Sequence, residues 1–221
     1  MRIGMVTPGQ SPRDDIVPEI RNYLHERVEI LEAGALDDIS EEEVAQRLSP
    51  ESDSDLLVTR MRDGRSVTVS ESKIAPLVQH CLEKLESKDV TIILLLCTGN
   101  FPTLRPERLL IKAGDLFTGV VRNVAHGGRI GVMIPNAAQA ARAQEKWATV
   151  GLEIKVGEAS PYQSVEAIEI AAERLRDEEL NLIALDCLGY NERMKELVRN
   201  ITNKPVVLPR SILARVLQEL L

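Results

Sequence analysis

The chain contains two apolar runs of one pattern, IILLLCTG at Ile92–Gly99 and LIALDCLG at Leu182–Gly189. Each run is rich in Ile and Leu and ends in a cysteine that is followed two residues later by glycine, which is typical of a buried strand in a parallel sheet. Three further pairs of segments match in the same order in both halves: Arg2–Pro8 with Arg129–Pro135, Val28–Ile30 with Leu152–Ile154, and Gly119–Val121 with Pro205–Val207. Because the order is kept, the sequence predicts two related β-α-β-α-β lobes.

Strand-like apolar runs alternate with longer segments of helical period along the whole chain. The predicted strands are Ile3–Thr7, Val28–Glu32, Thr91–Leu96, Gly119–Val121, Ile130–Ile134, Glu153–Val156, Leu182–Asp186 and Val206–Leu208. The predicted helices are Pro12–Glu26, Ser72–Ser87, Pro106–Ala113, Ala137–Val150, Ser164–Glu178, Glu192–Asn200 and Arg210–Leu221. In the second of these helices the spacing of apolar residues places Cys81 on the buried face. The alternation predicts an α/β protein with mainly parallel sheets.

The two halves differ by one long insertion. The first matched segments lie 127 residues apart and the two cysteines 90 residues apart, so the first half carries 37 extra residues. Nearly all of them fall within 34–70. This stretch predicts a short acidic helix at Ser40–Leu48 and a hairpin of Leu56–Met61 and Arg65–Val69 around an Asp-Gly turn. Two roles stay open for the insertion, a lid beside the site or a contact between the two copies of a homodimer.

Composition excludes several classes of function. The 221 residues carry a net charge of −7 and only 3% aromatic side chains, which is a poor composition for binding nucleic acid. The longest apolar run, Ile92–Cys97, is far shorter than the roughly 20 residues that a membrane helix needs. The N-terminal segment breaks at Pro8-Gly9 before a signal-type stretch forms. Since the three cysteines show no CxxC spacing, we expect a reduced, cytoplasmic protein without nucleic-acid or membrane partners.

Cys97 and Cys187 are the strongest functional signal. Each ends a predicted strand and precedes a predicted helix, and the carboxyl ends of parallel strands line the ligand crevice of an open sheet. The dipole of a following helix favours an anion, so we expect the pKa of both thiols to be lowered. Gly99 and Gly189 allow the backbone to turn sharply and to approach a ligand. Asp186, by strand alternation, is expected to point to the other face of its sheet and to be structural.

Two thiols that face each other across one cleft suit a specific reaction. One thiolate removes a proton from a carbon next to a carboxylate, and the other thiol returns a proton to the opposite face. The outcome is racemisation, epimerisation or isomerisation without a cofactor. Two other interpretations stay open, that both cysteines are small buried side chains or that they form a redox pair.

The loop between the first predicted strand and the first predicted helix is a second candidate site. Ser11 has the character of a helix N-cap, with Pro12 as the first helical residue. The loop is either a helix start alone or an anion site made of backbone amides and side chains. The remaining candidates could bond a carboxylate or serve only as turn or packing residues. The substrate-binding candidates are Thr7, Gln10, Ser11, Arg13, Thr98, Gly99, Asn100, Gly189 and Tyr190.

No motif for a metal or a nucleotide is present in the sequence. Neither GxxxxGK[ST] nor GxGxxG occurs, so ATP and NAD have no motif support. His25, His80 and His126 share no spacing typical of a metal site. We therefore expect no cofactor and no metal.

Four segments carry a resemblance to a known family: GQSPRDDIVPEI at 9–20, EAGALDDIS at 32–40, LLLCTGNFP at 94–102 and LDCLGY at 185–190. The chain resembles the AroM family, which is grouped with the aspartate/glutamate racemase superfamily. The resemblance implies two similar α/β lobes related by a pseudo-two-fold axis, with a cleft between them and Cys97 and Cys187 as catalytic cysteines. It also implies that the last helix returns to the first lobe, which gives a first lobe of 1–124 plus 209–221 and a second lobe of 125–208.

The sequence differs from glutamate racemases around both cysteines. Those enzymes read Cys-Asn-Thr and Cys-Thr-His, whereas this chain reads Cys97-Thr98-Gly99 and Cys187-Leu188-Gly189. We therefore expect a cofactor-independent racemase, epimerase or isomerase of a small carboxylate that is not tied to an α-amino acid. The alternative is a non-catalytic binding or regulatory protein that keeps the same cleft.

Overall fold

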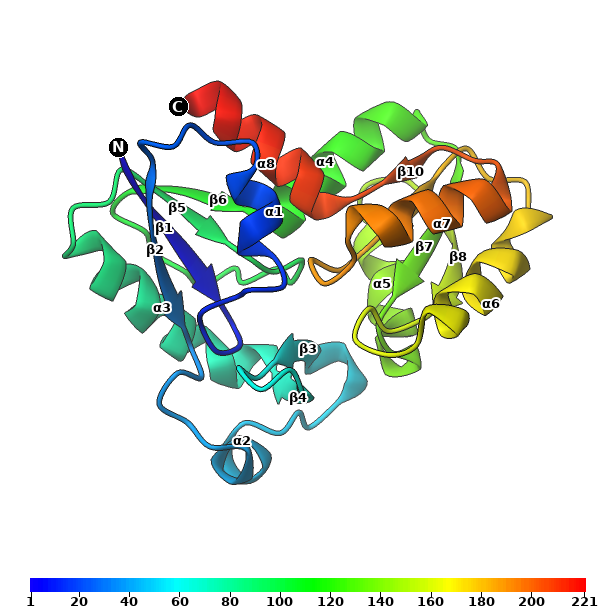
Figure 1. Cartoon of the computed structure of the whole chain (residues 1–221). Coiled ribbons are helices and arrows are strands. Elements are labelled where there is room, and N and C mark those ends of the chain that lie inside the picture. The colour runs from blue at the N-terminus through cyan, green and yellow to red at the C-terminus, as the bar shows by residue number, and fades with distance from the viewer.

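Two four-stranded parallel sheets form the framework of the molecule in the computed structural model, which describes residues 1–221 (Figure 1). The first sheet has the order β2-β1-β5-β6, with β2 at Glu29–Gly34, β1 at Arg2–Thr7, β5 at Ile92–Leu95 and β6 at Leu109–Lys112. The second sheet has the order β10-β9-β7-β8, with β10 at Val206–Val207, β9 at Ile183–Leu185, β7 at Arg129–Ile134 and β8 at Glu153–Glu158. Since the halves repeat one topology, the predicted α/β fold of two similar lobes with parallel sheets is confirmed.

The helices pack on both sides of these sheets. They are α1 at Val17–Arg21, α3 at Glu71–Glu86, α4 at Ala113–Ala125, α5 at Ala140–Ala148, α6 at Val165–Arg176, α7 at Glu192–Thr202 and α8 at Pro209–Leu220. The first helix is much shorter than the predicted Pro12–Glu26, and Ser11 is not its N-cap, because α1 starts only at Val17. None of the helices combines the length and the apolar character that a membrane crossing demands.

One strand and one helix were predicted in the wrong places. The predicted helix Pro106–Ala113 contains β6, and the predicted strand Gly119–Val121 lies inside α4. In α4 the side chains of Phe117, Val121 and Ala125 follow one another at helical spacing and are buried. This apolar stripe outweighs the strand preference of two adjacent valines. The counterpart of β10 in the repeat is therefore β6.

The insertion forms a separate layer below the two lobes (Figure 1). It contains α2 at Glu41–Arg47, a short 3-10 turn at Asp53–Asp55, and the antiparallel hairpin of β3 at Leu56–Arg60 and β4 at Ser66–Ser70. The hydroxyl of Ser40 and the carboxylate of Glu43 form a reciprocal capping box at the start of α2. Gly64 in the hairpin turn has φ of +91°, a conformation that favours glycine. The predicted hairpin and acidic helix are confirmed.

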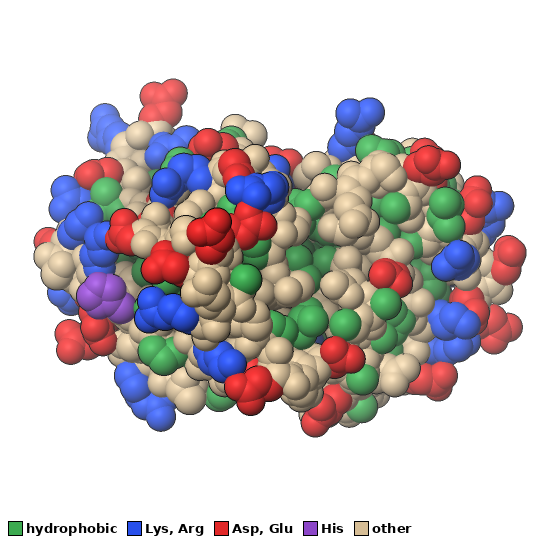
Figure 2. Space-filling view, turned by 90° about the horizontal axis from the view of Figure 1, so that it is seen from below, with side chains coloured by type: hydrophobic (Ala, Val, Ile, Leu, Met, Phe, Trp, Pro, Cys, Tyr) green, Lys and Arg blue, Asp and Glu red, His purple; other side chains and the backbone are tan.

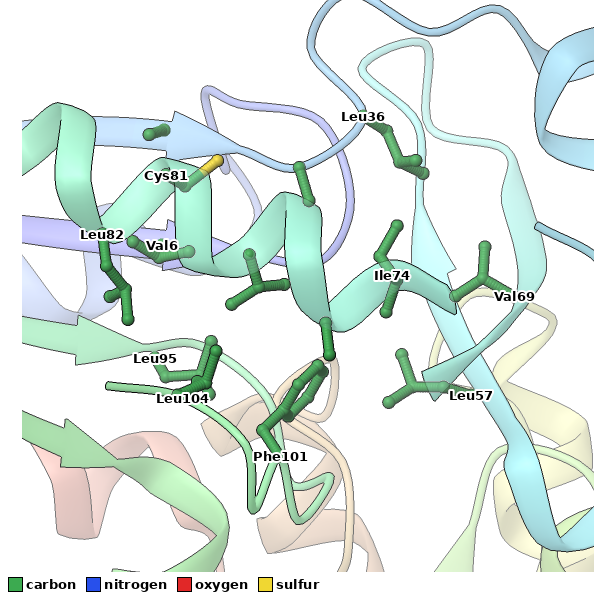
Figure 3. Packing of buried hydrophobic residues seen from close by; sticks show 14 of the residues in the cluster. Val6, Leu36, Leu57, Val69, Ile74, Cys81, Leu82, Leu95, Phe101 and Leu104 are labelled. Atoms are coloured by element: carbon green, nitrogen blue, oxygen red, sulfur yellow. The ribbon is translucent and has the colours of Figure 1, made fainter. Parts of the chain in front are cut away.

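The core of the first lobe lies on both faces of its sheet. On one face α3 packs with Ile74, Leu82 and the buried Cys81, which is 6% exposed as its helical spacing predicted (Figure 3). Leu57 and Val69 of the hairpin belong to the same apolar cluster, so the insertion is anchored by burial.

The last helix covers the opposite face of the first sheet. Leu213, Ala214 and Leu217 of α8 pack against Ile3 and Met5 of β1. The lobe boundaries at 124/125 and 208/209 stay a prediction of the sequence.

Candidate functional site

A small cavity of about 70 Å³ lies where the two sheets meet. Its wall contains the residues at or just past the carboxyl ends of the central strands: Pro8 after β1, Leu96–Gly99 after β5, Ile134-Pro135 at the end of β7 and Asp186–Leu188 after β9. Both Cys97 and Cys187 belong to this wall. The cavity therefore holds the two cysteines that the sequence singled out, at the strand ends where ligands bind in parallel sheets.

The backbone around the two cysteines is the same in both halves. The amide of each cysteine donates to the carbonyl two residues earlier, at 2.9 Å in both cases. The amides of Gly99 and Gly189 donate to the sulfur atoms of Cys97 and Cys187, at 3.3 and 3.4 Å. An N–H that points at a sulfur stabilises the thiolate form. The repeat therefore reproduces a local environment for sulfur as well as a strand.

The pKa values of both thiols differ from the sequence prediction, which expected them to be lowered. Burial raises the pKa of Cys97 to about 12, the amide of Gly99 offsets part of this effect, and the charge of Glu71 adds to it. Burial also raises the pKa of Cys187, against the lowering effects of the Gly189 amide and the Arg13 charge. Desolvation by burial therefore outweighs the donors at both thiols.

A further error in that prediction concerns the chain after Cys97. A loop and β6 follow this cysteine, and the nearest helix start is that of α4, where the Gly114 amide donates to the Cys97 carbonyl at 3.1 Å. That amide binds the backbone carbonyl and not the sulfur.

Two backbone amides beside the sulfurs have no acceptor in the chain. The amides of Thr98 and Leu188, each directly after a cysteine, donate no hydrogen bond to any protein atom, and Leu188 is only 3% exposed. Buried backbone N–H groups without a partner are rare in folded proteins. The two lie at equivalent positions of the repeat and belong to the cavity wall. They are unpaired donors of two residues in the wall that also contains both cysteines.

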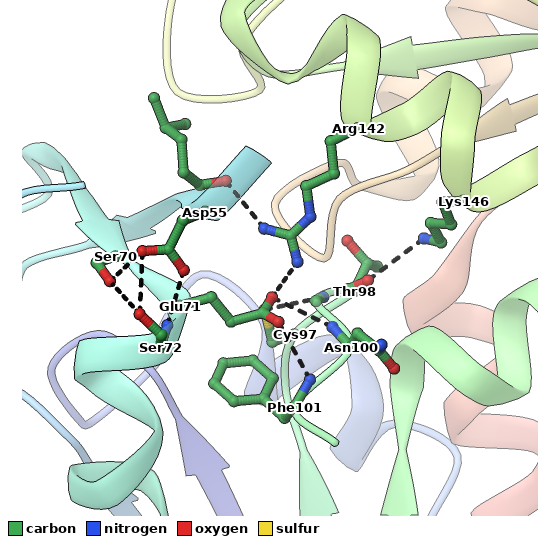
Figure 4. A network of polar contacts seen from close by, with 12 residues as sticks. Asp55, Ser70, Glu71, Ser72, Cys97, Thr98, Asn100, Phe101, Arg142 and Lys146 are labelled. Atoms are coloured by element: carbon green, nitrogen blue, oxygen red, sulfur yellow. Dashed lines mark hydrogen bonds and ion pairs between the residues drawn. The ribbon is translucent and has the colours of Figure 1, made fainter. Parts of the chain in front are cut away.

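Lys146 of α5 connects the two cysteine loops. Its ammonium donates to both carboxylate oxygens of Asp186, at 2.8 and 2.9 Å, and to the carbonyl of Thr98 at 3.3 Å (Figure 4). The indole of Trp147 donates to the same carboxylate at 3.1 Å. Asp186 therefore belongs to the cavity wall, whereas strand alternation predicted the other face. The alternation fails because β9 already ends at Leu185.

The insertion, which lies on the side of the molecule that Figure 2 shows, closes one side of the cavity. Residues Leu57–Thr59 of β3 belong to its wall. Arg142 of α5 donates to the Leu56 carbonyl at 3.2 Å and forms an ion pair with Glu71, the first residue of α3 (Figure 4). Glu71 also accepts hydrogen bonds from the amides of Asn100 and Phe101. These contacts place the hairpin where a lid would lie, and the homodimer contact stays a prediction.

Arg13 joins the first loop to the second lobe. The residue is 4% exposed, and its guanidinium donates to both oxygens of Asp15, at 2.8 and 2.9 Å, to the Thr7 hydroxyl at 2.8 Å and to the Tyr162 hydroxyl at 3.2 Å. Arg60 of the hairpin lies over the Tyr162 ring, 5.1 Å from its centre, and pairs with Asp15. Burial raises the pKa of Tyr162, so this hydroxyl stays protonated at neutral pH. Arg13 and Tyr162 both line the cavity.

Several predicted substrate-binding residues lie outside the cavity wall. The Gln10 amide group donates to the carbonyls of Leu36 and Ile39, and the Ser11 hydroxyl donates to Asp37. Thr7 lies behind the wall, where its hydroxyl accepts from Arg13. These groups hold the insertion and Arg13 in place, and Arg13 is the one loop residue predicted to bind substrate that belongs to the wall.

Some of the predicted residues after each cysteine line the cavity and others do not. Thr98 and Gly99 line the cavity, whereas Asn100 is exposed outside it and Gly189 lies behind it. Of the two roles left open for Tyr190, the structure has core packing, because the ring is fully buried and its hydroxyl donates to the Ala159 carbonyl. A Cβ at Gly189 would lie 2.6 Å from the Tyr162 ring, so this glycine admits a protein side chain in place of a ligand.

The sequence interpretation missed the polar residues that reach the site from the second lobe. These residues are Gln139, Arg142, Lys146 and Tyr162. Arg142 and Lys146 are four residues apart, so they share a helix face, which is the one signal that the sequence offered. Nothing local marks that face as the one that turns toward the other lobe.

The geometry agrees with comparisons to known proteins. The glutamate racemase of Aquifex pyrophilus has a TM-score of 0.62 at 17% identity, with 100% of this chain and 84% of that chain covered. The aspartate racemase of Picrophilus torridus has a TM-score of 0.65 at 13% identity, with 99% and 93% covered. The maleate isomerase Iso of Pseudomonas putida S16 has a TM-score of 0.64 at 11% identity, with 100% and 92% covered. At these identities the likeness establishes the fold alone, which this chain shares with the three enzymes.

The comparison by sequence is more specific. No curated protein matches the chain in sequence. The family model described as AroM protein matches residues 3–221, which is nearly the whole chain. The chain therefore belongs to the AroM family.

Proposed function

We propose that the protein is a cofactor-independent racemase, epimerase or isomerase of a small carboxylate, with Cys97 and Cys187 as its acid/base pair. One observation carries the proposal: two thiols at equivalent strand ends of a duplicated fold share one cavity and the same backbone environment. Proton transfer on two faces of one carbon requires two acid/base groups at one site, and the two thiols would supply such a pair.

The proposed reaction moves one proton off the substrate and another onto it. One cysteine, as thiolate, takes the proton from the carbon next to the carboxylate, and the electron pair of the C–H bond delocalises into the carboxylate as an enediolate. The other cysteine, as thiol, then gives its proton to the opposite face of that carbon, and the charge returns to sulfur. In the proposed reaction the unpaired amides of Thr98 and Leu188 donate to the oxygens where charge develops.

The raised pKa values of the thiols affect both the strength and the amount of base. A thiolate with a raised pKa is a stronger base once formed, but only a small fraction of the thiol is ionised at neutral pH. This second effect favours a rival function, a protein that binds a small carboxylate in the same cavity without reaction.

Hydrogen exchange tests the proposal directly. The protein is incubated in D2O with both enantiomers of a panel of amino acids, hydroxy acids and hydantoins, and loss of the α-proton signal is followed by NMR. We expect exchange by the wild type and by Cys81→Ala, whose sulfur lies in the core away from the cavity. We expect Cys97→Ala and Cys187→Ala each to stop interconversion of the enantiomers. Ligand-induced stabilisation across the panel without any exchange would instead support the rival.

A further inference from the structure

Every cation in the cavity wall already has a carboxylate partner. Arg13 pairs with Asp15, Arg142 pairs with Glu71, and Lys146 pairs with Asp186. The wall therefore presents paired groups of both signs, in which Arg142 and Lys146 each have a carboxylate and Arg13 shares Asp15 with Arg60.

The three carboxylates are themselves held by further donors. Glu71 accepts from two backbone amides of the loop after Cys97, Asp186 accepts from the Trp147 indole, and Asp15 pairs also with Arg60. A ligand that displaced one of them from its cation would leave a largely buried carboxylate without its charged partner, which is strongly unfavourable. The three cations are therefore committed within the protein.

N–H donors remain free in the wall, but no cation without a carboxylate partner remains. The free donors include the amides of Thr98 and Leu188, one of the five N–H groups of Arg13, whose other four bind Asp15, Thr7 and Tyr162, and three of the five N–H groups of Arg142, whose other two bind Leu56 and Glu71. A second carboxylate on the ligand would find no free cation, and burying an unpaired charge is costly.

The wall also contains an apolar part beside the polar side chains of Thr59 and Gln139, and the cavity is small. Leu57 and Val58 of the hairpin, with Ile134 of β7, contribute hydrophobic side chains. The cavity of about 70 Å³ is smaller than the roughly 150 Å³ of a cavity that holds benzene. A short aliphatic group fits this space better than an aromatic ring or an acidic chain.

We infer that the ligand of this site is a small monocarboxylate with a short, uncharged aliphatic substituent on the carbon next to the carboxylate. This inference rests on the proposed function for the location of the site, and it names the substrate class. It separates the protein from enzymes whose substrates carry two carboxylates.

Trp147 supplies a binding signal that does not depend on catalysis. It is the single tryptophan of the chain, and its indole N–H binds the carboxylate of Asp186 in the cavity wall. In ¹⁵N-labelled protein it gives one indole resonance. We would titrate this resonance with two matched pairs of ligands, lactate against malate and alanine against aspartate, using both enantiomers of each.

We expect lactate or alanine to shift the resonance with a Kd at least tenfold below that of the matched dicarboxylate. Equal or tighter binding of malate and aspartate would overturn the inference, as would the absence of any shift with the monocarboxylates at tens of millimolar. Tighter binding of the monocarboxylates without hydrogen exchange would contradict the proposed catalysis and still support the inferred ligand class.

Glu71→Gln provides a second arm. The glutamine oxygen still accepts from the backbone amides, but Arg142 loses its charged partner and becomes free for a second carboxylate. We expect malate to bind at least tenfold more tightly to this variant than to the wild type, with lactate changed less than threefold. Glu83→Gln, an exposed residue of the same helix, serves as the matched control. Unchanged malate binding in Glu71→Gln would contradict the argument that Glu71 occupies the cation.

Discussion

Replacing Lys146 by methionine tests the contact that joins the two cysteine loops. The change keeps an apolar side chain of similar length and removes the ammonium that binds Asp186 and the Thr98 carbonyl. Asp186, with 6% of its side chain exposed, would keep only the Trp147 N–H as a side-chain donor. Removing one partner of a buried ion pair costs about 3–5 kcal/mol. Since the Lys146 side chain is 25% exposed, water screens the pair, and we expect about 3 kcal/mol.

Equilibrium unfolding in urea measures this loss. With a slope of about 2–3 kcal/mol per molar urea, the midpoint should fall by about 1 M. Far-UV circular dichroism and Trp147 fluorescence must agree if the transition is two-state. The control is Lys195→Met, which removes an ion pair between residues three apart on α7 and should cost less than about 0.5 kcal/mol.

A double variant separates the ion pair from other effects of the substitution. Combining Lys146→Met with Asp186→Asn should recover about 1–3 kcal/mol, because no unpaired charge remains. A midpoint for Lys146→Met within error of that of Lys195→Met would refute the reasoning. A double variant with strictly additive losses would show that the two side chains are not coupled.

Three further outcomes follow from the structure. Iodoacetamide should alkylate Cys187 faster than Cys97 at pH 8. Burial raises the pKa of both thiols, but at Cys187 the lowering effect of the Arg13 charge exceeds the raising effect of Asp186, whereas at Cys97 the raising effect of Glu71 exceeds the lowering effect of Arg142. Both rates should rise about tenfold per pH unit up to pH 9, and equal rates by peptide mass spectrometry would contradict this prediction. Gly9→Ala should lower the free energy of unfolding by about 1–3 kcal/mol, since the added Cβ would collide with the hairpin backbone. Gly119→Ala should raise it by about 0.5–1 kcal/mol, because this glycine lies in a helix and its Cβ would face open space; urea titration of both variants checks the opposite signs. Burial alone would raise the pKa of Asp15, but Arg13 and Arg60 lower this pKa below its usual value. The Asp15 carboxylate therefore stabilises the fold above about pH 4, and this stabilisation is lost as the pH falls further. If the stabilities of the wild type and of Asp15→Asn declined in parallel from pH 5 to 2, this prediction would be excluded.

The elements that could be predicted are those with a local cause. The apolar runs Ile92–Gly99 and Leu182–Gly189 become β5 and β9 because continuous apolar character suits strands covered on both faces. Their repetition in order predicted the matching topology of the two sheets. The spacing in α3 likewise placed Cys81 in the core. In each case a few adjacent residues contain the whole signal.

The features that could not be predicted depend on contacts between distant residues. Leu109–Lys112 is a strand only because β5 lies beside it, and two valines sit in α4 only because Phe117 and Ala125 extend the same buried stripe. Ser11 has the local character of a helix cap, but Asp37 of the insertion binds its hydroxyl and the helix starts later. Local preference is overridden where a tertiary partner is stronger.

In the candidate site, too, the features with a local cause could be predicted and the features that depend on distant contacts could not. The strand ends located Cys97 and Cys187, but the sign of their pKa shifts depends on how tightly the hairpin and the second lobe enclose them. Arg142 and Tyr162 enter the site from the other lobe, and their partners Glu71 and Arg13 lie far away in the chain. A sequence pattern identifies the nucleophile candidates better than it identifies the enclosure around them.

The position of α8 has a consequence for biosynthesis. Leu213 and Leu217 of α8 belong to the same buried cluster as Ile3 and Met5 of β1. The apolar side chains of β1, one of the first strands to be translated, are therefore covered only after α8, the last helix, has been translated. At about 5–20 residues per second the delay is about 10–40 s. During this time the nascent strand carries an apolar surface that chaperones recognise, and protease digestion of ribosome-arrested chains that end before and after α8 would reveal when that surface becomes protected.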